Sequence, residues 1–304
     1  MSIRGPHTPP TMNLRTLLAL WLALIGLAPL RAEEPAAPLH LEGEIAGARW
    51  AAVVPDNWNG RLLLEAPDRR HAPAPLVAEL DTATSDHRAL LDAGWALATT
   101  SYRRTGPILI DAIDDLLALR DRLTTELGQP KMVLVAGTGM GGLIATLIAE
   151  RHSDDFHGAL AIDPKLDMRD PRALRLKCDG QPRGPLLFLF GPATARSVIA
   201  YSDRAGAVAN AESTVPVLWF RPADPAAEPA AATITLPTAV EALAAWVQTR
   251  QPPASRLETL PPMDDLPLPE GALTETNSAP AEAPLLPDEP PPTVPVDDPA
   301  PAQK

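Results

Sequence analysis

Short apolar runs alternate with longer amphipathic stretches between Glu34 and Gln251, a pattern that is typical of strands connected by helices. The runs contain few polar residues, as expected of parallel strands whose two faces are both covered. We therefore expect the α/β fold class, with a mostly parallel sheet and helices on both of its faces. The predicted strands are residues 40–46, 49–55, 61–66, 95–102, 131–136, 158–163, 185–190 and 215–220.

Two of the connecting helices have clear signals. Leucine recurs at helical spacing from Leu116 to Leu127, and Gly128 follows as a residue type that commonly ends a helix. A second helix is predicted from Thr238 to Thr249, at the end of the domain. Cys178 is the only cysteine, so no intramolecular disulfide can form and the domain must be held by an ordinary core.

The first 32 residues have the composition of a secretory signal peptide. Arg15 supplies a positive charge, Leu17–Ala28 is apolar, and acidic Glu33 follows the expected cleavage region. The apolar run is short for a membrane-spanning helix, so no stable membrane span is expected after cleavage. We predict a periplasmic or secreted protein, with an uncleaved N-terminal anchor as the alternative.

Residues 252–304 differ in composition from the rest, with fifteen prolines and ten acidic residues against two basic ones. Such a segment cannot bury enough apolar surface to offset the entropy of ordering it. We predict a disordered acidic tail, whose removal leaves the stability of the domain unchanged. The predicted organisation is a signal peptide over 1–32, a domain over 33–251 and the tail. Neither the domain nor the tail has a basic patch, which argues against nucleic acid as a partner.

Residues 131–152 read as a strand, a glycine-rich turn and an apolar helix, which allows two interpretations. Gly137, Gly139 and Gly142 fit the dinucleotide-binding pattern G-x-G-x-x-G, with Asp163 as the acidic residue after the next strand. At least three predicted strands precede the turn, whereas that pattern normally opens its fold. We therefore expect no cofactor, and dinucleotide binding is kept as a minor alternative.

The second interpretation is a nucleophile elbow, G-x-S-x-G, in which the central residue has positive φ and its neighbours at −2 and +2 must be small. Gly137 and Gly141 meet this requirement. The elbow would consist of Gly137, Thr138, Gly139, Met140, Gly141 and Gly142. Together with VPDNWNGRLLLEA (54–66), LLDAGWALATTSYRRTG (90–106), DAIDDLLALRDRL (111–123) and AERHSDDFHGALAIDP (149–164), the motif resembles a secreted esterase-type α/β-hydrolase. The resemblance implies a single α/β-hydrolase-like domain.

The catalytic residues that the resemblance implies are missing. Gly139 occupies the nucleophile position, and an elbow points the neighbouring Thr138 away from the site. The family places its histidine after the last strand, but residues 221–237 contain none. Its acid after the preceding strand would fall in residues 191–197, which have no carboxylate. The oxyanion loop reads Ala-Pro-Asp at 66–68, where proline lacks an N–H and the aspartate would repel an oxyanion.

Two further groups of residues outside the elbow have side chains suited to binding. The sequence from His152 to His157 contains two imidazoles and two carboxylates, but a solvated turn explains it better than a metal site, so no metal is expected. Tyr102, Arg103 and Arg104 follow a strand whose end faces the cleft, and could bind an anionic or aromatic ligand there. The alternative for these three is surface capping and ion pairing.

The sequence thus predicts a catalytically degenerate α/β-hydrolase homologue of the bacterial envelope. No residue is assigned a catalytic role, and the expected partner is an unidentified small molecule or envelope protein. Two alternatives belong to other classes. One is a carboxylic-ester hydrolase with relocated catalytic residues, and the other is an interaction protein that acts through its acidic tail.

Overall fold

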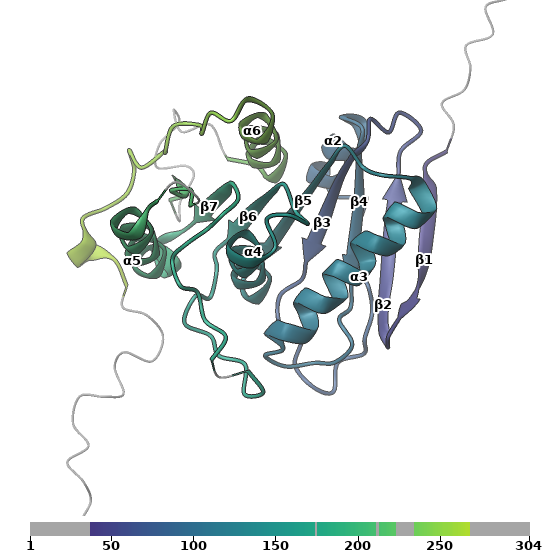
Figure 1. Cartoon of the computed structure of the whole chain (residues 1–304), viewed down its shortest axis with the longest axis horizontal. Coiled ribbons are helices and arrows are strands. Elements are labelled where there is room, and N and C mark those ends of the chain that lie inside the picture. Colours follow the sequence, from purple (N-terminus) through teal and green to yellow (C-terminus); the bar gives the residue numbers. More distant parts are fainter. Residues whose placement is uncertain (1–36, 174, 211–212, 223–233, 268–304) are drawn as a thin grey trace, which may run out of the picture.

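An eight-stranded sheet runs through the computed structural model, with the strand order β1-β2-β4-β3-β5-β6-β7-β8 (Figure 1). β2 is antiparallel to both of its neighbours, and the other neighbouring pairs are parallel. The strands are β1 (Leu39–Ile45), β2 (Ala48–Val54), β3 (Arg61–Ala66), β4 (Trp95–Thr100), β5 (Met132–Thr138), β6 (Gly158–Ile162), β7 (Leu186–Phe190) and β8 (Val217–Phe220).

The structure describes residues 37–173, 175–210, 213–222 and 234–267. The predicted signal peptide and the tail beyond residue 267 lie outside these ranges. Part of the loop after β8 also does.

Helices cover both faces of the sheet, which confirms the predicted fold class (Figure 1). One face packs against α3 (Leu109–Leu127), α4 (Met140–Arg151) and α5 (Pro192–Val208), and the other against α2 (Ser85–Asp92) and α6 (Leu236–Thr249). Because both faces are covered, every residue of β4 and of β7 is buried. The apolar runs in the sequence are the direct consequence of this two-sided packing.

The leucine-rich helix agrees with its prediction. Leu116, Leu119 and Leu123 of α3 are buried against the sheet. Gly128 follows the helix with a φ of +85°, a conformation that glycine adopts without a steric penalty. The spacing of the leucines therefore determines which face of α3 enters the core.

The boundary predicted at Gln251 is too early, because residues 252–267, here called the C-terminal strap, pack on the domain. Arg256 forms a parallel bridge with β8: its N–H donates to the carbonyl of Leu218 at 2.8 Å, and its carbonyl accepts from Phe220 at 2.9 Å. The Arg256 guanidinium lies 4.1 Å from the ring centre of Trp219. The strap thereby covers the open edge of the sheet.

From the β8 edge, the strap continues onto the face of the sheet that packs against α5. Leu257 and Leu260 pack against the core on the side of α5, and Leu266 is 4% exposed. The carbonyl of Leu266 accepts from Arg196 of α5 at 2.9 Å. Although this segment is rich in proline, it has enough apolar side chains to anchor it. The composition averaged over residues 252–304 does not show this.

We predict that deleting residues 254–304 lowers the thermal midpoint by roughly 5–10 °C, because three leucine side chains lose buried contacts. Deleting only residues 268–304 should leave the midpoint within about 2 °C, since a proline-rich acidic segment contributes few packed contacts. Differential scanning calorimetry of the two truncated proteins measures the difference. Equal midpoints would show that the strap contributes no packing energy.

Candidate functional site

The turn between β5 and α4 is the centre of the candidate site. Gly139 has φ +62° and ψ −115°, the positive φ expected at the centre of an elbow. Its N–H donates to the carbonyl of Ile162 at 3.1 Å, and its carbonyl accepts from Leu143 and from Lys165. The turn is therefore fixed to the end of β6 as well as to its own helix.

Close backbone contacts explain the glycines around the turn. A Cβ atom at Gly141 would overlap the carbonyl oxygen of Ala66, and one at Gly137 would overlap the backbone of Gly141. At Gly142 a Cβ atom would come within 2.9 Å of the carbonyl oxygen of Ile162. The motif thus serves the packing of β3, β5 and α4 against one another.

Asp68 fills the space in which a side chain at residue 139 would lie. A Cβ atom on Gly139 would be 2.5 Å from both Cγ and Oδ1 of Asp68. Oδ1 accepts a hydrogen bond of 2.7 Å from the N–H of Met140. In serine hydrolases with an elbow, the N–H at this position, one residue after the nucleophile, stabilises the oxyanion. The start of α4 is also where a dinucleotide phosphate would bind, so Asp68 weighs against that alternative as well.

Asp163 joins the carboxyl ends of three strands, β6, β7 and β8. Its Oδ1 accepts from the N–H of Gly191 at 2.7 Å and from the Thr194 hydroxyl at 3.2 Å, and its Oδ2 pairs with Arg221 at 2.7 Å. Gly191 follows β7 and Arg221 follows β8, the positions after which the family carries its acid and its histidine. The loops in which the family carries its acid and its histidine are therefore joined here by Asp163, through its bond to Gly191 and its ion pair with Arg221.

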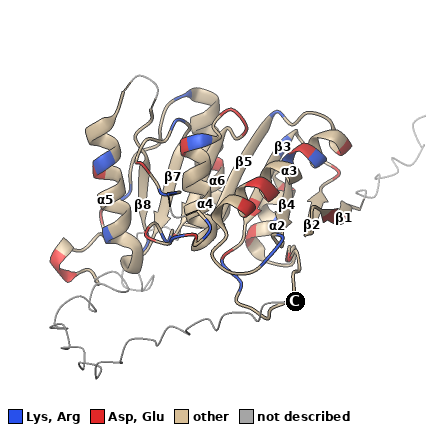
Figure 2. Cartoon of the chain, turned by 60° about the horizontal axis from the view of Figure 1, so that its bottom comes forward, with Lys and Arg blue, Asp and Glu red and all other residues tan. Residues whose placement is uncertain are grey.

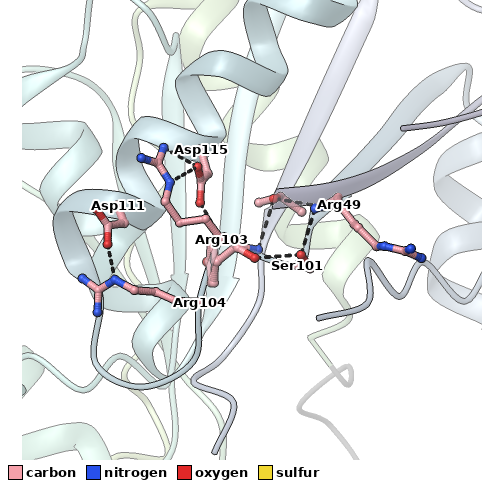
Figure 3. A network of polar contacts seen from close by, with 8 residues as sticks. Arg49, Ser101, Arg103, Arg104, Asp111 and Asp115 are labelled. Atoms are coloured by element: carbon pink, nitrogen blue, oxygen red, sulfur yellow. Dashed lines mark hydrogen bonds and ion pairs between the residues drawn. The ribbon is translucent and has the colours of Figure 1, made fainter. Parts of the chain in front are cut away.

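The two arginines proposed as ligand-binding residues are paired with carboxylates of α3 (Figure 3). Arg103 Nε donates to Oδ1 of Asp115 at 2.8 Å, and Arg104 pairs with Asp111. Burial raises the pKa of Asp115 above its ordinary value, and the bonds from Arg103 oppose this rise. Acidic and basic residues both occur along α3 (Figure 2). Ligand binding by either arginine would compete with these pairs.

Tyr102, the third proposed ligand-binding residue, is buried with 2% exposure. Its hydroxyl donates to the carbonyl of Pro67 at 3.1 Å, next to Asp68. Burial raises the pKa of Tyr102 well above its ordinary value, so the side chain remains a neutral donor. Tyr102 therefore holds the loop after β3 in place.

None of the histidines in the described part of the chain hydrogen-bonds to the elbow. His71 lies on the loop after β3, where it is exposed and contacts Arg69 at 3.4 Å. The ring of His157 accepts from the N–H of Val133, and His152 lies 3.5 Å from Asp155. Within the described residues, no three histidine, cysteine or acidic side chains lie close enough together to hold a metal ion.

His87 is a partly buried ion-pair residue that the sequence does not indicate. Its Nε2 lies 2.7 Å from Oε1 of Glu65, on β3, and its Nδ1 lies 2.6 Å from the carbonyl oxygen of Asp81. The bond to Glu65 raises the pKa of His87 to about 9, although burial acts in the opposite direction. His87 is therefore charged at neutral pH and attaches α2 to the end of β3.

Comparison with known proteins adds solved structures of similar fold. No family model matches the sequence, and no curated protein matches it. The chain resembles the Pyrococcus furiosus esterase Pf2001 (16% identity, 61% of this chain and 82% of that chain, TM-score 0.45). It also resembles EstE1, a thermophilic carboxylesterase cloned from a metagenomic library (16% identity, 62% and 80%, TM-score 0.47).

A third similar structure comes from a study of two prolyl endopeptidases (15% identity, 61% of this chain and 34% of that chain, TM-score 0.46). The chain spans about a third of the length of the peptidases that it matches. The strand order and the glycine turn after β5 independently define an α/β-hydrolase fold. The chain has this fold, and Gly139 lies at the centre of the turn.

We predict that His87→Gln lowers the free energy of unfolding by about 1–3 kcal/mol at a pH of about 6, because a charge-assisted bond is lost. The folded pKa of His87 lies above its ordinary value of 6.5, so its contribution is complete below that pH and is lost as the pH rises through about 9. Urea unfolding of both proteins should therefore give a gap that narrows at a pH of about 10. A constant gap would contradict the ion pair.

Proposed function

We propose that this chain is a catalytically degenerate α/β-hydrolase homologue that binds a small molecule or a protein in the bacterial envelope. The observation that supports this proposal most strongly is the pairing of Gly139 with Asp68. The residue at the nucleophile position has no side chain. The Asp68 carboxylate occupies the space beside it and accepts a hydrogen bond from the N–H of the next residue, Met140. Each half of the pair removes one part of the serine mechanism.

Serine-type acyl transfer needs a nucleophile, a base and oxyanion donors in one place. At this elbow the nucleophile is missing and the Met140 N–H already donates to a carboxylate. A negative charge at that position opposes a developing oxyanion. Losing one oxyanion donor alone typically reduces kcat by about 10²–10³. The proposal therefore rests on several missing parts, not on one substitution.

The location in the envelope is proposed from the sequence of the first 32 residues, which has the charge and apolar pattern of a secretory signal peptide. Within the described ranges, none of the helices is both long and apolar enough to cross a bilayer. The ligand or partner is proposed only as a class, a small molecule or an envelope protein.

We predict that the purified protein does not hydrolyse short-chain activated esters, such as p-nitrophenyl acetate, above the rate of a buffer blank. The reason is that Gly139 supplies no nucleophile beside the Met140 N–H and that this N–H already donates to Asp68. A spectrophotometric assay across neutral pH measures the rate. Saturable turnover, with a serine labelled by a fluorophosphonate, would contradict the proposal and favour a hydrolase with relocated residues.

We predict that Gly139→Ser also fails to create esterase activity, because an unassisted serine hydroxyl is a weak nucleophile. The same change should lower the free energy of unfolding by roughly 2–3 kcal/mol, through the strain of positive φ and the overlap with Asp68. Ester turnover and urea unfolding measure the two effects separately. Rapid turnover would show that a base lies within reach, with His71 as the first residue to replace.

A further inference from the structure

The loop that follows β3 lies directly on the elbow. A Cβ atom at Gly141 would overlap the carbonyl oxygen of Ala66, so the loop and the first turn of α4 are in backbone contact. The Tyr102 hydroxyl donates to the carbonyl of Pro67 and holds the loop from the side of β4. Together the two contacts fix the backbone of the two residues that precede Asp68.

The Asp68 carboxylate occupies a position that attracts negative charge. The first N–H groups of a helix have no partner inside it, and the aligned peptide dipoles favour an anion there. Oδ1 of Asp68 accepts from the N–H of Met140 and from the N–H of Arg69, each at 2.7 Å. The helix thus receives its anion from its own chain.

A side chain at residue 139 and the carboxylate of Asp68 exclude one another. A Cβ atom at Gly139 would lie 2.5 Å from Oδ1 and 2.7 Å from Oδ2 of Asp68, closer than two non-bonded heavy atoms approach. The overlap involves the whole carboxylate group, so the exposed Asp68 side chain relieves it only by rotating away and giving up its hydrogen bond to the Met140 N–H. Glycine at 139 is therefore a condition for the position of Asp68.

We propose that the loop after β3 is a built-in plug. The Asp68 carboxylate of this plug occupies the pocket in which a hydrolase would hold its oxyanion. Gly139 leaves room for that carboxylate because it has no side chain. The plug closes the pocket to small carboxylates, and removal of the Asp68 side chain opens it to them. The inference goes beyond the proposed function, because a site can lose its nucleophile and still remain open.

The exclusion is tested by a double-mutant cycle on thermal midpoints. In the wild-type background, Gly139→Ala should lower the midpoint by roughly 5 °C or more. In an Asp68→Gly background the same change should cost about half as much, because backbone strain remains but the overlap is gone. Gly128→Ala is the control: Gly128 also has a positive φ, but a Cβ atom there would meet nothing within 4 Å. Its effect should be equal in both backgrounds.

The pocket itself is tested with acetate as the probe. Sodium acetate should raise the midpoint of Asp68→Gly in a saturable manner, relative to sodium chloride at the same ionic strength. The wild-type protein should show no such difference. An equal cost of Gly139→Ala in both backgrounds, or no acetate-specific rise in Asp68→Gly, would overturn the plug. Neither readout depends on ester turnover, so failure of the plug is distinguishable from failure of the proposed function.

Discussion

The hydrogen bond from the Met140 N–H to the Asp68 carboxylate joins the loop after β3 to the start of α4, and the arrangement of the candidate site depends on it. It requires that residue 139 have no side chain, and it requires the close approach that Gly141 permits against Ala66. A contact of this kind combines a helix terminus, a charge-assisted bond and steric exclusion. The backbone has the geometry of an elbow, and its helix terminus binds a side chain of the same chain.

Side chains at the neighbouring strand ends also form structural contacts. Asp163 binds the N–H of Gly191 and the side chain of Arg221, and in doing so joins the ends of β6, β7 and β8. Asp163 has a φ of +41°, an uncommon conformation for a residue other than glycine, which these bonds stabilise. Asp163 and Arg221 thus compensate each other's charge within the fold.

The sequence predicts the strands well because burial on both faces leaves an unmistakable apolar run, as in RLLLEA at β3 and WALATT at β4. It predicts the elbow because the spacing of Gly137, Gly139 and Gly141 reflects local geometry. It does not predict α5, whose start at Pro192 carries only the signal of a proline in the first turn.

Contacts between distant segments are the part that the sequence does not reveal. The role of Asp68 depends on a residue 72 positions away, and no local pattern indicates that pairing. The sequence does not reveal the strap, because only a few leucines and Arg256 attach it to the domain. The average composition of the tail is that of a disordered segment. The partners of Tyr102 and Arg103, which lie on the loop after β3 and on α3, are likewise not indicated by any local pattern.

A crystal structure of the protein soaked with a small alkyl phosphonate, a mimic of the tetrahedral intermediate of ester hydrolysis, tests the central claim most directly. The account predicts no phosphonate at the elbow, with Asp68 Oδ1 within hydrogen-bond distance of the Met140 N–H. A phosphonate oxygen bound to that N–H, with Asp68 displaced, would contradict it.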